Sequence, residues 1–396
     1  MESLTQPASI NAPVRIGMVG GGEGAFIGAI HRAAMRLDGL HELVCGALSS
    51  EPARAGRSAA AIGIPRERAY ADYGAMIRQE ATMNPGERAE AIVIATPNNL
   101  HLPVARMALE HGFHVFCEKP MTLNLAEARE LRDVARASGR VFGIAHTYCG
   151  YPLVVQAKRL LAVGRIGDVR RIVVEYPQGW LARSEETLGN KQAAWRTRAA
   201  TAGTGAIGDI GTHAFQLTEF ITGDQATELR AELNSMVAGR AIDDEAVVEL
   251  RLRRGGKVLL TASQVTIGEE NGLRIRVHGA LGSIAWRQEQ PNSLWLQRLD
   301  SPAELWRAGS NAAYLDPQVR AMCRTPMGHP EGYIEALANL YRHFADRIRA
   351  TGDDEQSRES RNDDFPGIDA GLRGMAFLDA AVASSKDGGR WKPICA

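Results

Sequence analysis

The chain of 396 residues is longer than one hydrophobic core normally serves, so two domains are expected. Its 46 basic and 46 acidic side chains give a formal net charge of +0, which provides no electrostatic footprint for nucleic acid or an anionic membrane. The polar N-terminal residues, the lack of a membrane-spanning apolar run and five cysteines without metal-ligand spacing predict a cytoplasmic protein with small-molecule partners and no metal site.

The first predicted strand, 14–20, runs directly into a glycine-rich turn and then a helix over 29–37. Strand, glycine turn and helix form the context that a dinucleotide fingerprint requires, because glycines let the backbone approach a pyrophosphate and the helix N-terminus offers unpaired amides. The turn is irregular, since Gly28, the best match for the third glycine, arrives three residues late. The alternative is a flexible loop. The predicted cofactor contacts here are Gly20, Gly22, Gly24, Ala25, Phe26 and Ile27.

The second predicted strand, 42–48, leaves the choice between NAD and NADP open. An acidic residue at its end would hydrogen-bond the adenosine ribose of NAD, but Ser49 and Ser50 follow Leu48 instead. These serines and Arg54 are candidate contacts for a 2′-phosphate. Arg54 is equally plausible as a solvated helix residue.

Two further strands, 91–95 and 113–117, are each followed by polar residues and proline. In a parallel sheet, ligands bind beyond the carboxyl ends of the strands, so these segments are expected at the mouth of a cofactor crevice. His101 can alternatively cap the next helix. A last strand at 141–145, with helices between the strands, predicts a doubly wound parallel Rossmann sheet over 13–147. The predicted cofactor contacts of this region are Thr96, Pro97, Asn98, His101, Glu118 and Lys119.

After residue 147 the pattern changes from alternating strands and helices to successive strands. One helix is predicted at 153–164, and then β-rich runs at 169–176, 228–237, 245–252, 257–265, 273–278, 283–287 and 293–297. They predict an α+β domain, 148–396, on a large, mostly antiparallel open sheet, through which a homo-oligomer would form. The polar segment 352–364 is expected to be a mobile loop, and the helix 369–385 to pack on one of the two domains.

A second informative stretch, 202–213, combines alternating glycines with Asp209 and His213. Their four-residue spacing places carboxylate and imidazole on one face of a helix. The alternative is an aspartate near a helix N-terminus and a core histidine. The presence of Lys119 in the first half favours a joint catalytic role for the three residues.

Taken together, these motifs resemble the Gfo/Idh/MocA family, named for glucose-fructose oxidoreductase and inositol dehydrogenase. The resemblance implies hydride transfer between a nicotinamide cofactor, NAD or NADP, and a secondary hydroxyl of a sugar, glycoside or cyclitol. It also implies that Lys119 and His213 face the reacting hydroxyl while Asp209 orients them. The matching pieces are the glycine turn through His31, 96–101, Glu118-Lys119-Pro120, 208–213, the hairpin at Gly279 and Gly282, 369–373 and 389–391.

Several other residues are candidates for binding the substrate. Tryptophans beside polar side chains suit a sugar ring, which has an apolar face and a rim of hydroxyls, although surface packing is equally plausible for them. His329 is expected to enter the pocket. Two other functions stay open: reduction of an imine or conjugated double bond, and a non-catalytic cofactor-binding regulator. The substrate-binding candidates are His146, Tyr148, Trp180, Trp195, Arg196 and His329.

Overall fold

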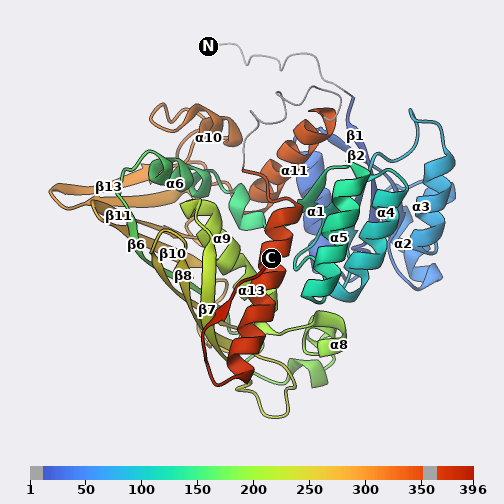
Figure 1. Cartoon of the computed structure of the whole chain (residues 1–396). Coiled ribbons are helices and arrows are strands. Elements are labelled where there is room, and N and C mark those ends of the chain that lie inside the picture. The colour runs from blue at the N-terminus through green and yellow to red at the C-terminus, as the bar shows by residue number, and fades with distance from the viewer. Residues whose placement is uncertain (1–11, 351–363) are drawn as a thin grey trace.

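The computed structural model describes residues 12–350 and 364–396, which form two α/β units side by side (Figure 1). The first unit is built on a parallel five-stranded sheet in the order β2-β1-β3-β4-β5. Its five strands lie where the apolar runs predict them, because residues buried on both faces of a sheet leave continuous apolar segments. The strands are β1 (Val14–Gly20), β2 (His41–Ala47), β3 (Ala91–Ala95), β4 (His114–Cys117) and β5 (Phe142–Ile144).

Helices cover both faces of this sheet, which confirms the doubly wound arrangement. One apolar cluster joins the sheet to α1 (Phe26–Leu37) and α2 (Pro52–Ala61). The other joins it to α3 (Tyr73–Thr82), α4 (His101–Glu110) and α5 (Leu125–Ser138). The carboxyl ends of the strands are left open between these layers.

The long helix α11 (Tyr333–Arg349) belongs to the second half of the chain but packs on the first sheet. Its Tyr341 and Phe344 rings lie 4.7 and 5.4 Å from the ring of Phe116 in β4. A boundary placed at one point in the sequence therefore does not separate the two units in space. The segment that opens α11 is carried to the mouth of the first sheet by this packing.

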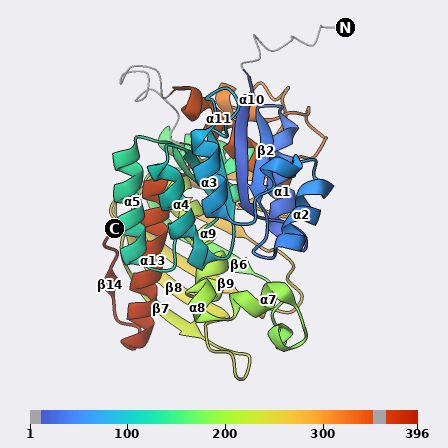
Figure 2. The same cartoon turned by 90° about the vertical axis from the view of Figure 1, so that its right-hand side faces the viewer.

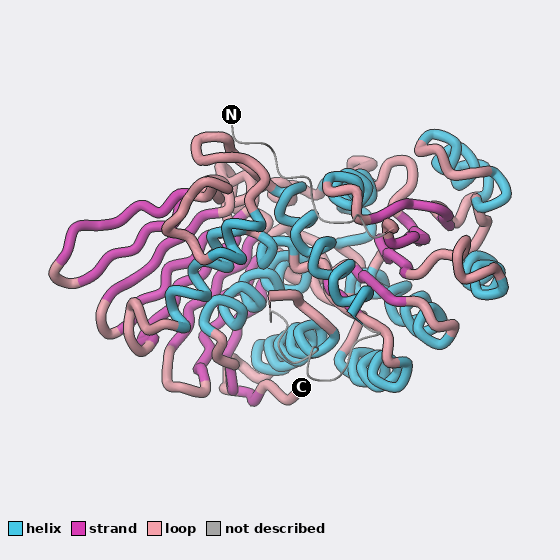
Figure 3. The backbone as a smooth tube through the Cα atoms, turned by 90° about the horizontal axis from the view of Figure 1, so that it is seen from above, coloured by secondary structure: helices cyan, strands magenta, loops and turns pink. Residues whose placement is uncertain are grey.

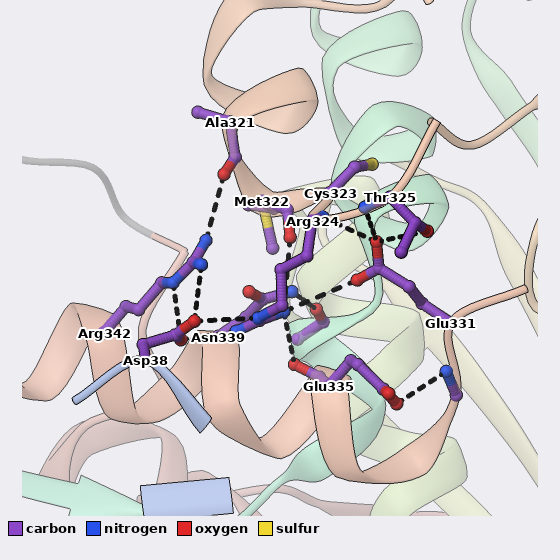
Figure 4. A network of polar contacts seen from close by, with 12 residues as sticks. Asp38, Ala321, Met322, Cys323, Arg324, Thr325, Glu331, Glu335, Asn339 and Arg342 are labelled. Atoms are coloured by element: carbon purple, nitrogen blue, oxygen red, sulfur yellow. Dashed lines mark hydrogen bonds and ion pairs between the residues drawn. The ribbon is translucent and has the colours of Figure 1, made fainter. Parts of the chain in front are cut away.

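A partly buried polar network holds α11 in this position (Figure 4). Asp38, at the end of α1, accepts two hydrogen bonds from Arg324 and two from Arg342 of α11, at 2.6 to 2.9 Å. Arg324 also contacts Glu331, whose Oε1 accepts the backbone N–H of Thr325 at 2.8 Å. The network joins the two halves of the chain next to the segment that begins α11.

The second unit is a nine-stranded sheet in the order β13-β12-β11-β10-β6-β9-β8-β7-β14. Every neighbouring pair is antiparallel except β6 and β9, which confirms a mostly antiparallel sheet. Two edge strands, β13 and β14, were not predicted. The strands are β6 (Val169–Pro177), β7 (Ala226–Asn234), β8 (Glu245–Leu252), β9 (Lys257–Ser263), β10 (Arg274–Gly279), β11 (Gly282–Arg287), β12 (Ser293–Arg298), β13 (Ser301–Arg307) and β14 (Lys392–Pro393).

Helices cover the face of this sheet that looks toward the first unit, as Figures 1 and 3 show. Residues alternate along each strand, so that Ala246, Val248 and Leu250 of β8 are buried while Val247 on the opposite face is 39% exposed. The remaining helical elements are α6 (Pro152–Ala162), α7 (Lys191–Arg196), α8 (Ala199–Ala202), a π-helical turn (Ile207–Gly211), α9 (Thr212–Thr222) and α10 (Pro317–Met322).

Helix α13 (Ile368–Lys386) lies between the two units, beside both α5 and β7 (Figure 2). Asp369 pairs with Arg136 of α5 at 2.8 Å, and Ser384 Oγ accepts the backbone N–H of Ala231 in β7 at 2.9 Å. The predicted helix thus packs against both units at once.

The predicted mobile loop at 352–364 lies outside the described residues, except for its last residue. Asp364 is buried and pairs with Lys158 at 3.0 Å and with Arg159. Within the described ranges, no helix combines the length and apolarity needed to cross a membrane.

Candidate active site

The glycine-rich turn after β1 has a backbone that requires glycine at several positions. Gly20, Gly21 and Gly24 adopt positive φ angles of 78°, 71° and 78°. A Cβ on Gly28 would lie 2.1 Å from the carbonyl oxygen of Gly21, so α1 approaches the turn more closely than any side chain permits. The late glycine therefore provides the close packing of helix against turn that the third glycine of a dinucleotide fingerprint provides.

The start of α1 fits the phosphate groups of a dinucleotide. Its N-cap residue, Ala25, has no side chain that can accept the first amides, and no acidic residue stands in the first turn. Free amides at the positive end of a helix form an anion site. The amides of Gly22 and Ala25 donate to the carbonyl oxygens of Leu48 and Gly22, so the pyrophosphate would be held at Gly24 and the first turn of α1, where Phe26 and Ile27 line the adjoining cavity.

The segment after β2 carries no carboxylate immediately after the strand, as its sequence shows. Ser49 Oγ accepts the backbone N–H of Glu51 at 3.2 Å, and Arg54 forms an exposed pair with Glu51 at 3.1 Å. Arg57 pairs with Glu23 of the glycine turn at 3.2 Å. The predicted roles of Ser49, Ser50 and Arg54 toward the cofactor remain predictions.

The turns after β3 and β4 deliver Thr96, Asn98, Glu118 and Lys119 to the wall of one cavity. His101 does not line it. This histidine is fully buried, and its ring nitrogens lie 2.8 Å from the carbonyl oxygen of Pro120 and 3.0 Å from that of Thr96. The expectation that His101 contacts the cofactor is therefore corrected: its ring joins the two turns and fixes their spacing.

Glu118 anchors the turn that carries Lys119. Its Oε1 lies 2.9 Å from Nε2 of His31 in α1, and Nδ1 of His31 lies 2.7 Å from the hydroxyl of Tyr341. Burial alone would raise the pKa of Glu118, but the bond to His31 and nearby positive charges lower it. Glu118 is thus an ionised carboxylate that ties α1, β4 and α11 together behind Lys119.

Lys119 and Asp209 form an ion pair between the two units. The Lys119 ammonium lies 2.8 Å from Oδ1 of Asp209 and 2.6 Å from its backbone oxygen. The other carboxylate oxygen accepts from Gln264 at 2.8 Å and from Arg196 at 3.3 Å. Burial alone would raise the pKa of Asp209, but Lys119 and Arg196 outweigh burial and hold it well below its usual range. The carboxylate stays charged and fixes the lysine.

His213 lies one turn beyond Asp209, and both side chains line the same cavity, as their spacing predicts. The turn between them is π-helical, a rare geometry that is frequent at functional sites. Burial, followed by the charge of Lys119, holds the pKa of His213 well below its usual range. Its Nδ1 is buried and has no hydrogen-bond partner among the residues that the structure describes. His213 is therefore a neutral imidazole, which can accept a proton.

Aromatic rings position the imidazole of His213. The ring of Tyr148 meets it edge-on at 4.8 Å, and the ring of His146 does so at 5.5 Å. His146 does not line the cavity, so its expected contact with substrate is corrected: it packs behind His213. Burial lowers the pKa of His146 to about 3.

The cavity has a volume of about 780 Å³ and lies between the two units. On the side of the nine-stranded sheet, its wall is a connected polar network. Tyr176 donates to Asn271 at 2.7 Å, Gln178 donates to Asn271 at 2.8 Å, and Trp180 donates to Gln178 at 3.0 Å. Tyr148 hydrogen-bonds Tyr176. Such a wall presents hydroxyl, amide and indole groups to a polar ligand.

The structure brings most of the predicted substrate residues into this cavity. Tyr148, Trp180, Trp195 and Arg196 line it, and the Arg196 guanidinium stacks on the Trp195 ring at 4.2 Å. His329 does not enter it. That side chain is exposed, with Nδ1 3.3 Å from the carbonyl oxygen of Pro326, because residues before α11 turn outward. The expectation for His329 was wrong.

Sequence reasoning missed other residues that line the cavity. They come from loops beside the nine-stranded sheet and from the first turn of α11, where the local sequence has no catalytic motif, so only the fold places them at the site. These residues are Asn271, Gln288 and Glu335. Gln264, which holds Asp209, was missed for the same reason.

Comparison with known proteins places both halves of the chain in one family. Residues 14–146 match the model described as oxidoreductase family, NAD-binding Rossmann fold, and residues 154–285 match the GFO/IDH/MocA C-terminal domain. An uncharacterized oxidoreductase of Bacillus subtilis is 32% identical over 386 residues, which covers 96% of this chain and 97% of that protein.

Solved structures agree over nearly the whole chain. An inositol dehydrogenase homolog from Azotobacter vinelandii, in complex with NADH and myo-inositol, is 34% identical with a TM-score of 0.88 and covers 96% of this chain and 97% of its own. An oxidoreductase from Sinorhizobium meliloti is 41% identical with a TM-score of 0.85 and covers 96% and 100%. The chain belongs to the GFO/IDH/MocA family of NAD-binding oxidoreductases.

Proposed function

We propose that this enzyme oxidises a secondary hydroxyl of a sugar, glycoside or cyclitol and passes the hydride to NAD+. The observation that carries the proposal is the presence of Lys119, Asp209 and His213 around one cavity beside the glycine-rich turn. The solved homologue that holds NADH and myo-inositol supports the same class of substrate. A non-catalytic regulator would not need this constellation.

The three side chains suit the chemistry of alcohol oxidation. The cofactor supplies the acceptor for the hydride that leaves the carbinol carbon. The hydroxyl proton then passes to the neutral imidazole of His213. Lys119 donates a hydrogen bond to the oxygen as negative charge develops, which stabilises the transition state. Asp209 orients the ammonium of Lys119.

The charges around the cavity favour an uncharged polyol over a phosphorylated sugar. Lys119 and Arg196 are the basic side chains that line it within the described residues, and both already contact Asp209. Glu118, Glu270 and Glu335 add negative charge to the lining. A phosphate would therefore meet repulsion without a free cation to bind it.

A substrate panel tests the proposal. Purified enzyme is assayed for NADH formation with myo-inositol, free aldoses, methyl glycosides and glucose 6-phosphate. We expect turnover of one of the uncharged polyols and little with the phosphate ester. No cofactor reduction with any member of the panel would contradict the proposal.

Two histidine variants sharpen the assignment of the base. His213→Asn, which cannot transfer the proton, is expected to lower kcat by about 10²- to 10⁴-fold. The matched control His329→Ala removes an exposed histidine outside the cavity and should leave kcat unchanged. Near-normal turnover by the His213 variant would overturn its role as the acid/base.

We further propose that the enzyme forms homo-oligomers in the cytoplasm. The open face of the nine-stranded sheet exposes 39 to 44% of Val247, Trp295 and Leu305, and a second copy would cover these apolar side chains. All five cysteines are free and four are buried, as suits a reducing compartment. A monomeric mass in light scattering would contradict the oligomer.

A further inference from the structure

Helix α7 contacts the glycine-rich turn although 168 residues separate them in sequence. Gln192 Nε2 donates to the carbonyl oxygen of Gly24 at 3.4 Å. A Cβ placed on Gly24 would lie 3.6 Å from Nζ of Lys191. Figure 2 shows α7 beneath the helices of the first unit. A segment of the second unit therefore reaches the predicted phosphate site.

The contact is made at a glycine of the turn. Gly24 lies between Gly22 and the late Gly28, and its φ of 78° requires glycine. On the other side, Asn190 caps α7 by accepting the N–H groups of Gln192 and Ala193 at 3.0 and 3.3 Å. The cap holds Lys191 and Gln192 at the first turn of the helix, facing the loop.

From Gln192, a chain of hydrogen bonds leads to the catalytic lysine. Gln192 Oε1 accepts from Arg196 at 2.6 Å, and Arg196 Nε donates to Oδ2 of Asp209 at 3.3 Å. Oδ1 of Asp209 accepts from Lys119 at 2.8 Å. Gly24, Gln192, Arg196, Asp209 and Lys119 thus form one continuous polar path from the phosphate site to the reacting centre.

The positive charge of Lys191 suits the position of α7 beside the glycine turn. Lys191 is exposed and forms no ion pair with any described residue, whereas Arg196 on the same helix is paired with Asp209. An unpaired ammonium beside this turn and the helix N-terminus that follows it adds to an anion site. A pyrophosphate there would attract Lys191 and hold α7 against the turn.

We infer that α7 is a part of the cofactor site that couples NAD+ binding to the substrate site. Lys191 supplies positive charge to the pyrophosphate. Gln192 bonds both the turn and Arg196, so a shift of the turn changes the positions of Arg196 and Asp209. Cofactor binding then holds α7 against the turn and stabilises the cavity wall that Trp195 and Arg196 form. The inference rests on NAD binding by the chain.

Hydrogen exchange and calorimetry test this inference without substrate or turnover. Amide exchange of peptides spanning 190–203 is measured with and without saturating NAD+, and the Kd for NAD+ is measured for wild type, Lys191→Ala, Gln192→Ala and Arg198→Ala. Arg198 is the matched control, because it is an exposed cation on the same segment with no side-chain hydrogen bond or ion pair among the described residues.

We expect NAD+ to slow exchange of this segment in the wild type. Lys191→Ala should raise the Kd about three- to tenfold and reduce its dependence on salt, as loss of one phosphate contact does. Gln192→Ala should lose most of the NAD+-induced protection of 190–203. The Arg198 variant should match the wild type, and unchanged thermal denaturation shows that each variant is folded.

Two results would overturn the inference. One is equal exchange of 190–203 with and without NAD+ in the wild type. The other is a Kd for NAD+ in the Lys191 and Gln192 variants equal to that of the wild type. Because neither measurement involves substrate, these results would leave the proposed dehydrogenase activity to be judged by its own assay.

Discussion

The ammonium of Lys119 donates to both the carboxylate and the backbone oxygen of Asp209, at 2.8 and 2.6 Å. An ammonium has three donors, so one N–H remains for a ligand in the cavity that Lys119 lines. The two residues come from opposite halves of the chain, and their pairing requires the two units to meet at this edge. The ion pair therefore joins the two units and orients the ammonium of Lys119 at the cavity.

Replacing Lys119 by Met tests its electrostatic role. We expect kcat to fall about 10²- to 10⁴-fold, since the developing alkoxide loses its charged donor. The positive charge of Lys119 also lowers the pKa of His213. Its removal should raise that pKa and move the acid limb of the kcat/KM profile to higher pH. Profiles measured from pH 5 to 9 check this, and an unmoved acid limb would contradict the coupling.

Asp38→Ala tests the network that seats α11. The variant leaves Arg324 and Arg342, which are 15% and 28% exposed, without their shared carboxylate. We expect the free energy of unfolding to fall by about 2–4 kcal/mol. Urea unfolding measures the loss. Arg298→Ala, which breaks an exposed pair with Glu304, is the control and should cost less than about 1 kcal/mol. An equal loss of unfolding free energy in both variants would refute the stabilising role of the Asp38 network.

His114 should make the protein less stable in acid. Burial, then nearby arginines, lower the pKa of His114 to about 4, and its Nδ1 accepts the N–H of Val141 at 2.9 Å. Between pH 6.5 and 4 the unfolded chain binds a proton that the folded chain does not, so stability falls as pH decreases, by about 1.4 kcal/mol per pH unit. His114→Asn retains an acceptor without titrating.

Denaturant unfolding at pH 7, 6, 5 and 4 measures this effect. The stability of the Asn variant should decline less steeply than that of the wild type over this range. Parallel declines in the two proteins would show that His114 does not contribute.

Two Gly→Ala substitutions separate a required glycine from a replaceable one. Gly28→Ala places a methyl group against the backbone of Gly21, which cannot move aside, so we expect a loss of about 1–3 kcal/mol and weaker NAD+ binding. Gly56 is exposed in α2, and no atom of the described part of the chain lies within 4 Å of its Cβ position. Its replacement by Ala should stabilise the helix by about 0.5–1 kcal/mol and leave NAD+ binding unchanged.

Thermal denaturation and calorimetric NAD+ titration compare the two glycine variants. Unchanged stability and affinity in the Gly28 variant would show that the turn tolerates a side chain there.

Local sequence determined much of the fold. The strands Ala91–Ala95 and Glu245–Leu252 are found with the predicted bounds. In each of them, the order of apolar and polar residues matches the order of more and less buried positions. Edge strand β13 was missed, since its polar composition and Pro302 reflect its exposed position. That Lys119, Asp209 and His213 line one cavity could be predicted, because glycine, proline and charged residues interrupt the apolar runs there.

Contacts between distant segments were decided by the tertiary structure alone. The sequence of α11 does not indicate that this helix covers the first sheet. Likewise, the sequences around Gln192 and Gly24 do not indicate that these two residues meet. The positions of His101 and His329 could not be predicted locally either. The ring of His101 is held by two backbone oxygens, and the side chain of His329 is exposed at the surface. A side chain's type states what chemistry it can perform, but packing of the whole chain decides whether that chemistry faces the cavity.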